Sequence, residues 1–216
     1  MDNINTRAYW ENRFSTGDWE EKHGRSQTAR FAEAIVTRIK VPNSFSGTIL
    51  DFGCGLGDAT PVYRSAFPKA HLIGVDISPA AVVKCREQYG LIAQFFDCDH
   101  LNVPTVDVII SSNVFEHLTS DKQIARSLLE KCKDLFIVTP YRERIVPGTE
   151  HVNSYETTSF SDLGCCATTV YPCKGWSQYG LDLWLNIYLK NAVRPLFGKE
   201  TCRRSMQIMF HLTNHK

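Results

Sequence analysis

Five apolar runs alternate with stretches of helical spacing between Gly47 and Thr139, and this alternation constrains the fold more than any other feature of the sequence. The runs are TILDFG, HLIGVDIS, LIAQFFD, VDVIISS and DLFIVTP. They are rich in β-branched and aromatic residues and lack polar–apolar alternation, which predicts parallel strands covered on both faces. Strands that alternate with helices in this way predict a doubly wound α/β sheet.

The flanking segments add elements at both ends. A segment of helical spacing, residues 28–39, follows an aromatic and charged stretch, YWENRFSTGDWEEKHG. After the fifth run the sequence predicts a polar loop, a short helix near 155–163, a strand over 166–171, an apolar helix over about 179–193 and a final strand in RRSMQIMFHLT. We therefore expect a mostly parallel, seven-stranded, Rossmann-like sheet with an antiparallel last strand and a late helical insertion.

The composition is that of an ordinary globular chain. Its 216 residues are 43% hydrophobic and carry a formal net charge of +1 without a basic face or tail, so we expect no nucleic-acid partner. The polar opening MDNINTRAYWENRF is unlike a secretory signal, and no apolar run is long enough to span a bilayer. We therefore expect a cytoplasmic protein.

Eight cysteines are scattered along the chain without a C-x-x-C pair. A zinc site built from Cys165, Cys166 and Cys173 is an alternative, but its spacing is irregular. Four of the eight cysteines lie in or beside predicted strands, where a free thiol packs as a small apolar group. We therefore expect reduced thiols and assign no metal ligands.

The first apolar run leads into LDFGCGLGDAT, in which an acid precedes Gly53, Gly55 and Gly57. Glycine gives up packing and backbone entropy, so this turn requires a chain without side chains. The spacing is G-x-G-x-G and Asp58 follows at once, which disfavours an anionic pyrophosphate at the turn. No G-K-[ST] follows, which excludes a P-loop, so the turn favours a ligand whose central part is cationic or neutral.

Polar residues also end the next three runs. Asp76, in GVDIS, stands about twenty residues after the turn, where an acid accepts hydrogen bonds from ribose hydroxyls. Asp97, in FFDCDHL, is placed to accept from an adenine amine, and Asn113 follows the fourth run. These strand ends predict one nucleoside-binding crevice, and the acid alone does not separate NAD from S-adenosylmethionine.

In order and spacing, LDFGCGLG, GVDIS, FDCD and DVIISSNVFEHL resemble the successive motifs of the class I S-adenosylmethionine-dependent methyltransferases. The opening YWENRF is similar to the Y-W-x-x-R-[FY] start of members that act on small molecules, and the resemblance covers roughly residues 9–139. It implies a single domain over 1–216. Its parts would be a helical cap over 1–46, a cofactor-binding core over 47–139 and an acceptor-side segment over 140–216 with the helical insertion at about 178–195.

The resemblance implies residues for the adenosine part of S-adenosylmethionine. Asp76 would hold the ribose and Ile77 would pack on the adenine, while Asp97 and Cys98 would read the adenine edge. Alternatively, Asp76 is only a helix N-cap. The joint occurrence of all the motifs favours the cofactor site.

The methionine part would lie against the glycine turn. The resemblance places it beside Gly53, Cys54 and Gly55, with Asp51 near its ammonium and Asn113 near the methyl group. Alternatively, the glycines form a tight turn without a ligand. Three residues of the N-terminal segment would lie over the cofactor: Tyr9, Trp10 and Arg13.

Methyl transfer from a sulfonium depends mainly on positioning, and a hydroxyl acceptor is helped by a base, most often histidine. Our candidate catalytic residues are His117, after the fourth run, and His151 and Tyr141, in the polar loop after the fifth. Alternatively, His117 supports the turn and His151 is exposed to water. No N-P-P-Y or D-P-P-Y follows the fourth run, which disfavours methylation of DNA bases or glutamine.

We therefore expect methylation of a small polar metabolite or glycan-type acceptor at oxygen. N- or C-methylation and a non-catalytic cofactor-binding scaffold are the alternatives. The predicted helix over 179–193 packs on the sheet, covers the acceptor pocket or makes a homodimer contact, because its apolar residues extend over two faces. An interfacial membrane helix is disfavoured, since its polar face has few basic residues.

Overall fold

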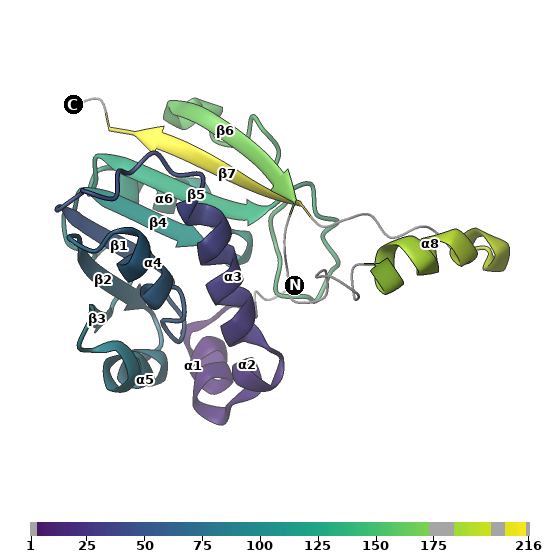
Figure 1. Cartoon of the computed structure of the whole chain (residues 1–216), viewed down its shortest axis with the longest axis horizontal. Coiled ribbons are helices and arrows are strands. Elements are labelled where there is room, and N and C mark those ends of the chain that lie inside the picture. Colours follow the sequence, from purple (N-terminus) through teal and green to yellow (C-terminus); the bar gives the residue numbers. More distant parts are fainter. Residues whose placement is uncertain (1–3, 173–183, 200–205, 215–216) are drawn as a thin grey trace.

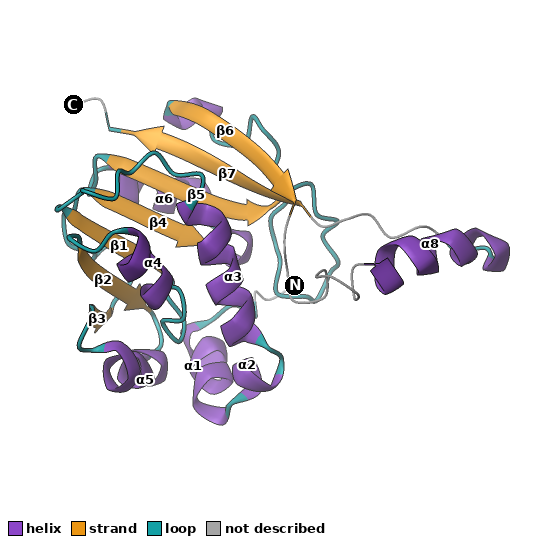
Figure 2. Cartoon of the chain, viewed as in Figure 1, coloured by secondary structure: helices purple, strands orange, loops and turns teal. Residues whose placement is uncertain are grey.

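The computed structural model describes residues 4–172, 184–199 and 206–214, and its seven strands form one sheet with helices on both faces (Figures 1 and 2). The strands are β1 (Thr48–Phe52), β2 (His71–Asp76), β3 (Gln94–Asp97), β4 (Val108–Ser112), β5 (Asp134–Pro140), β6 (Cys165–Pro172) and β7 (Met206–Thr213). Their order across the sheet is β3-β2-β1-β4-β5-β7-β6. β1 to β5 pair in parallel, whereas β7 is antiparallel to both β5 and β6, which confirms the predicted sheet.

Buried residues alternate between the two faces of the central strands. On β5, Leu135 and Ile137 belong to the core on one face, and Phe136 and Val138 belong to the core on the other. Both sets are fully buried or nearly so, which is why the strand reads as an unbroken apolar run.

The helices that precede the late insertion come from both halves of the chain. They are α1 (Arg7–Thr16), α2 (Asp18–Glu21), α3 (Gly24–Val36), α4 (Thr60–Ala66), α5 (Pro79–Tyr89) and α6 (Asp121–Leu129). Buried residues of α3 and α4 pack in one core, and those of α6 pack in the other. The strand order reverses between β1 and β4, so a crevice opens there at the carboxyl ends of the strands.

In the sequence, Asp58 and the pair Ser78-Pro79 each stand where an N-cap or first-turn residue is expected, and the structure confirms only the second. Ser78 is the N-cap of α5, because its Oγ accepts a hydrogen bond from the backbone N–H of Ala81 at 3.1 Å. Asp58 does not cap α4, which begins at Thr60 without a side-chain cap. Its carboxylate instead accepts a hydrogen bond from the Tyr89 hydroxyl at 2.9 Å and pairs with Arg25.

The predicted short helix near 155–163 is wrong except for a 3-10 turn at Ser161–Leu163. Tertiary contacts hold the preceding backbone in place of a helix. Tyr155 is buried, forms an isolated β-bridge with Tyr141 and donates its hydroxyl hydrogen bond toward the backbone oxygen of Phe115 at 2.8 Å.

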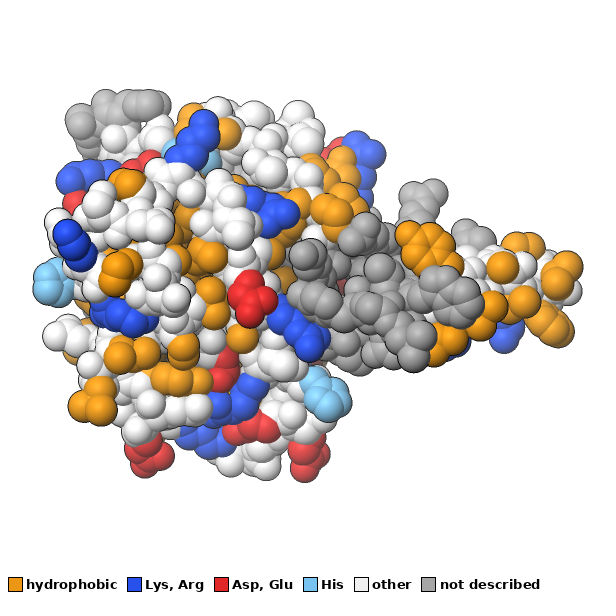
Figure 3. All heavy atoms as spheres, in the orientation of Figure 1, with side chains coloured by type: hydrophobic (Ala, Val, Ile, Leu, Met, Phe, Trp, Pro, Cys, Tyr) orange, Lys and Arg blue, Asp and Glu red, His pale blue; other side chains and the backbone are white. Residues whose placement is uncertain are grey.

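The late insertion stands away from the sheet (Figure 1). It contains a π-helical turn at Trp184–Leu189, helix α8 (Lys190–Val193) and a 3-10 turn at Arg194–Phe197. Hydrophobic side chains are exposed along it, among them Tyr188 at 62% and Phe197 at 74% (Figure 3). Packing on the sheet is therefore wrong for this part of the predicted helix, and residues 179–183 of that helix lie outside the described residues.

Six cysteines fall within the described residues, and all six are free thiols. Cys173, the third member of the alternative zinc site, lies outside the described residues. None of the helices in the described ranges combines the length and apolar character that a bilayer-spanning helix requires.

Candidate active site

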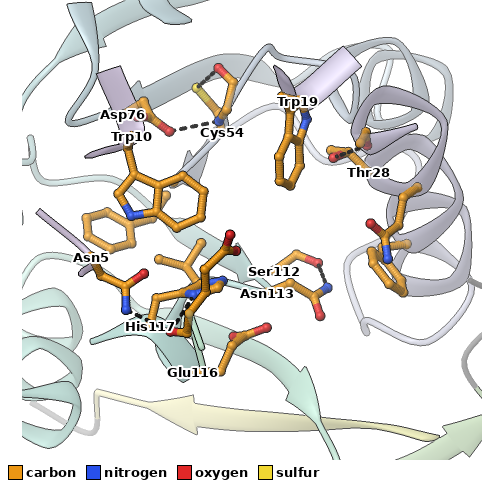
Figure 4. Close-up of a pocket in the computed structure, with 18 of the residues that line it drawn as sticks. Asn5, Trp10, Trp19, Thr28, Cys54, Asp76, Ser112, Asn113, Glu116 and His117 are labelled. Carbon is orange, nitrogen blue, oxygen red and sulfur yellow. Dashed lines mark hydrogen bonds between the residues drawn. The ribbon is translucent and has the colours of Figure 1, made fainter. Parts of the chain in front are cut away.

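A cavity of about 640 Å³ lies at the carboxyl ends of the central strands. Figure 4 shows Asp76 and Cys54 on one side of it, Glu116 and His117 on the opposite side, and Trp10 between them. The predicted site residues that line it are Trp10, Arg13, Gly53, Cys54, Gly55, Asp76, Ile77, Cys98, Asn113, His117 and His151. Four predicted residues do not line it: Tyr9, Asp51, Asp97 and Tyr141.

The glycine turn is tied to β2 by its backbone. The N–H groups of Gly53 and Cys54 donate to the backbone oxygen of Val75 at 2.8 and 3.0 Å. Gly53 has a φ of +75°, and a Cβ added there would lie 2.4 Å from Cγ2 of Val114. A side chain at this position is excluded by both conformation and space, so the turn presents bare backbone to the cavity.

Asp76 is the acid at the end of β2 and is held by the same turn. One carboxylate oxygen accepts from the N–H of Gly55 at 2.9 Å, and the other accepts from the N–H of Ser78 at 3.0 Å. Burial raises the pKa of Asp76 to about 6 despite these hydrogen bonds. Each oxygen retains a further lone pair, so the fixed carboxylate can accept two more hydrogen bonds from a ligand.

Asp51 and Asp97 lie beside this end of the cavity without lining it. Asp51 is buried on β1, and its burial and the nearby charge of Asp76 raise its pKa to about 7. Asp97 ends β3 next to Asp76 in the sheet register, is partly exposed and lies 3.6 Å from Arg7. Asp51 is therefore a buried carboxyl group behind the turn, close enough to Asp76 for their charges to interact.

Helix α1 closes the cavity on one side. The buried guanidinium of Arg13 contacts the carboxylate of Glu150 and lies 3.0 Å from that of Asp18. The Tyr9 hydroxyl also donates to Glu150, so Tyr9 stands behind the cavity wall. Trp10 stacks on Phe14 and meets the ring of His117 edge-on, with centroids 5.0 Å apart. The N-terminal helix is thereby fastened to the loop after β5.

His117 and His151 meet at the far end of the cavity, with ring centroids 4.8 Å apart. Nδ1 of His117 lies 3.1 Å from the backbone oxygen of Glu150, and Nδ1 of His151 lies 2.6 Å from Oε2 of Glu143. Burial lowers the pKa of His117 to about 4. Burial also opposes protonation of His151, but the hydrogen bond to Glu143 and neighbouring carboxylates outweigh it and raise its pKa.

Glu116 anchors this arrangement. Its backbone oxygen accepts hydrogen bonds from the N–H groups of Val152 and Asn153 at 2.7 and 3.2 Å, which draws the loop carrying His151 against the turn after β4. Its carboxyl group is buried at the cavity wall, and burial raises its pKa to about 8. The side chain therefore contributes a carboxyl group to the same end of the cavity.

Asn113 and Tyr141 end neighbouring strands and have different placements. Asn113 has a φ of +55° and lines the cavity, with its side-chain oxygen accepting from Nε2 of Gln207 at 2.9 Å. Tyr141 is bridged to Tyr155 and packs against the core. The candidate catalytic tyrosine thus does not line the cavity.

Glu143 and the carboxyl group of Glu116 belong to the site although no sequence motif indicates them. Glu143 shares the polar loop with His151, and Glu116 directly precedes His117. Their role depends on how that loop folds back onto the turn after β4. A polar loop with several ionisable residues is the only signal in the sequence.

Residues 50–136 match a family model described as "Methyltransferase domain". A malonyl-[acyl-carrier protein] O-methyltransferase of Anoxybacillus flavithermus is 33% identical over 106 residues, which cover 47% of this chain and 40% of that protein. A trans-aconitate 2-methyltransferase of Afipia carboxidovorans is 28% identical over 121 residues, which cover 52% of this chain and 47% of that protein. The chain thus spans less than half the length of these curated relatives.

Solved structures share the fold at low sequence identity. The plantazolicin methyltransferase BpumL in complex with SAH matches with a TM-score of 0.59 and 20% identity, covering 97% of this chain and 95% of that one. The putative methyltransferase in complex with the Trm112 methyltransferase activator of Haloferax volcanii matches with a TM-score of 0.69 and 13% identity, covering 95% and 98%.

The sheet and its glycine turn define a Rossmann-like methyltransferase fold. Residues 50–136 thus match a methyltransferase domain, and the chain is similar in sequence and fold to class I S-adenosylmethionine-dependent methyltransferases.

Proposed function

We propose that this chain transfers a methyl group from S-adenosylmethionine to an oxygen atom of a small polar acceptor, such as a metabolite or a glycan. One observation carries the proposal: a single cavity has the glycine turn and Asp76 at one end and two histidines at the other. The first end has the features of a nucleoside site, and the second has those of an acid–base site.

The residues of the first end fit the cofactor. The cavity volume of about 640 Å³ lies within the range of small-molecule sites. Asp76 would hold the ribose hydroxyls, and Ile77 and Cys98 would face the adenine. Gly53 and Gly55 would let the methionine part approach the backbone, while the buried charge of Asp51 would favour its ammonium. When bound, S-adenosylmethionine supplies an electrophilic methyl group.

Three further predicted residues surround this position. Trp10 and Arg13 would cover the cofactor from α1, and Asn113 would lie beside the methyl group, as the sequence motifs imply. Tyr9 would act indirectly, since its hydroxyl supports Glu150 behind the cavity wall. Asp97 would reach the adenine edge only if its partly exposed side chain turned from Arg7 toward the cavity.

His151 is our first choice for the base that accepts the acceptor's proton. Glu143 holds its Nδ1–H, which leaves the lone pair on Nε2, and a carboxylate in this position also stabilises the imidazolium that forms. His117 is the alternative, because it stays neutral at physiological pH and lies against His151. Tyr141 is left out of the proposed acid–base group, because it does not line the cavity.

The relatives favour an acceptor oxygen. One is named for O-methylation of a malonyl group on acyl-carrier protein, and another for methylation of trans-aconitate. Both of these named acceptors carry carboxylates, so a small carboxylic acid is the first class of acceptor to test. A carboxylate is already ionised at neutral pH, and such an acceptor would need positioning more than a base.

Binding of S-adenosylhomocysteine, measured by calorimetry, tests the cofactor site. Asp76→Ala should weaken binding at least tenfold, because it removes two ribose acceptors, whereas Asp162→Ala serves as an exposed control outside the cavity. Equal affinity of the wild type and the Asp76 variant would refute the ribose assignment.

Formation of S-adenosylhomocysteine in the presence of acceptor panels tests the activity. A hydroxylated or carboxylic acceptor should be consumed, and His151→Ala should reduce turnover while cofactor affinity is retained. Turnover with amine or carbon acceptors alone would select N- or C-methylation. Cofactor binding without turnover on any panel would favour the scaffold alternative.

We also propose a cytoplasmic location and self-association through the exposed segment 184–197. The six free thiols among the described residues support a reducing compartment. Exposed apolar residues on the segment, such as Leu196 and Phe197, support a contact between two copies. Cell fractionation and sedimentation of wild type and Phe197→Ser would test these two statements separately.

A further inference from the structure

Glu116, His117 and His151 form a cluster at the far end of the cavity. Each offers one possible metal-ligand atom, and the three atoms lie within 4.8 Å of one another. Two of the residues belong to the turn after β4 and the third to the loop after β5, so the fold brings them together. We propose that this cluster binds a divalent transition-metal ion, with zinc as its representative.

Both histidines are held as metal-bound histidines are held. Nδ1 of His117 is hydrogen-bonded to the backbone oxygen of Glu150, and Nδ1 of His151 to the carboxylate of Glu143. Metal-ligating imidazoles almost always donate their other ring N–H to a carbonyl or a carboxylate in this way. The arrangement fixes both rings and leaves Nε2 of each as the metal-binding nitrogen.

Glu116 supplies the independent observation that points to a ligand. Its side chain is 1% exposed and lies at the cavity wall, and its Oε2 has no hydrogen-bond partner among the described residues. Such an atom carries a large desolvation cost unless something pairs with it. A cation between Glu116 and the two rings would satisfy it.

The ligand set selects the class of ion. Two imidazoles and one carboxylate suit zinc and related first-row ions, whereas magnesium prefers an all-oxygen shell. Ligand atoms around a tetrahedral zinc lie about 3.3 Å apart, so the longest separation in the cluster must shorten by up to about 1.5 Å when the ion binds. Three protein ligands leave one position open, as in catalytic zinc sites, and this position would face the cavity.

The ion would also act on the methyl acceptor, an inference that rests on the proposed function. An acceptor oxygen in the open position would be oriented by the ion, which also lowers the pKa of an oxygen that it binds. A nitrogen bound to the ion cannot at the same time accept a proton. With the ion bound, His151 would therefore not act as the base. The ion would instead stabilise the acceptor oxygen electrostatically.

Zinc titration of the chelator-treated full chain, followed by calorimetry, tests the site. We expect one ion per chain and a cobalt(II) complex with visible absorption bands of a four- or five-coordinate ion. His151→Ala and Glu116→Gln should each weaken zinc binding at least about tenfold. His71→Ala is the matched control, because His71 is an exposed histidine outside the cavity, and its affinity should equal that of the wild type.

If His151→Ala or Glu116→Gln does not fold, Glu143→Gln tests the site in its place. This substitution removes no metal ligand and should weaken zinc binding by about 10- to 100-fold. S-adenosylhomocysteine binding is measured on every variant, so that loss of the cofactor site and loss of the metal site are distinguished. Absence of stoichiometric zinc from the wild-type chain would overturn the proposal. So would an unchanged zinc affinity in the ligand variants or in Glu143→Gln.

Discussion

Nδ1 of His151 lies 2.6 Å from Oε2 of Glu143, and both residues belong to the loop that follows β5. The contact sets the direction of the imidazole, because the proton on Nδ1 is directed at the carboxylate and the lone pair is on Nε2. His151 needs this orientation whether Nε2 accepts a proton or binds an ion. Glu143 is therefore a positioning residue in either mechanism.

Glu143→Gln should lower kcat by about 10- to 100-fold while KM and S-adenosylhomocysteine affinity change little, because the side chain acts on the histidine and not on the ligands. Steady-state kinetics with the acceptor found in the panel measures this separation. Glu156→Gln is the control, since Glu156 is an exposed acid paired with Arg142. A rise in KM with kcat preserved would assign Glu143 to substrate binding instead.

Asp51→Asn should stabilise the protein without ligand at pH 8 and have little effect at pH 4. The pKa of Asp51 is raised from 3.8 to about 7 by burial and by Asp76, so the folded chain binds more protons than the unfolded chain between these values. Wild-type stability therefore falls as pH rises through this window. The gain of the variant above the window is about 4 kcal/mol at most, because a difference of one pKa unit corresponds to about 1.4 kcal/mol.

Urea unfolding of both proteins at pH 4, 6 and 8 measures this difference, with Glu130→Gln as an exposed control. A stability difference that stays constant with pH would mean that Asp51 is not the titrating group. If Asp51 favours the cofactor's ammonium, the stabilised variant should also bind S-adenosylmethionine more weakly.

The sequence predicts the nucleoside end of the site well, because that end depends on chain order. Parallel strands bring their carboxyl ends to one edge, so Gly55 and Asp76 meet wherever this sheet forms. Unbroken apolar runs predict strands covered on both faces, and β1 and β5 fulfil this. These features require no knowledge of loop conformation.

The acceptor end could not be predicted in the same way. Glu143 meets His151 because a loop folds back onto the backbone of Glu116, and no residue spacing encodes that contact. The apolar residues of the late helix likewise predict that its surface is covered, but they do not indicate by which element. In the structure, Leu196 and Phe197, just after this predicted helix, are exposed. Asp58 stands where an N-cap is expected, but Tyr89 and Arg25 engage its carboxylate.

Arg13→Met should destabilise the protein by about 2 kcal/mol, because it removes the cation shared by Asp18 and Glu150 while keeping the buried volume. Both acids are partly exposed, so water reduces the penalty below that of a fully buried pair. Urea unfolding measures the loss. Arg7→Met removes an exposed 3.6 Å contact with Asp97 and should cost less than about 0.5 kcal/mol. Equal effects of the two variants would contradict the role of Arg13 in fastening α1 to the loop after β5.

Gly53→Ala and Gly148→Ala separate backbone strain from close approach at the cavity. The two glycines have similar φ angles, +75° and +83°, so each alanine pays about 1–2 kcal/mol for a left-handed conformation. At Gly148 the new methyl group meets nothing within 4 Å, whereas at Gly53 it would lie 2.4 Å from Val114. Gly53→Ala should therefore cost more than Gly148→Ala by thermal unfolding and should alone impair S-adenosylhomocysteine binding. Equal melting temperatures and cofactor affinities of the two variants would mean that the turn tolerates side chains and that its bare backbone is not required by the ligand.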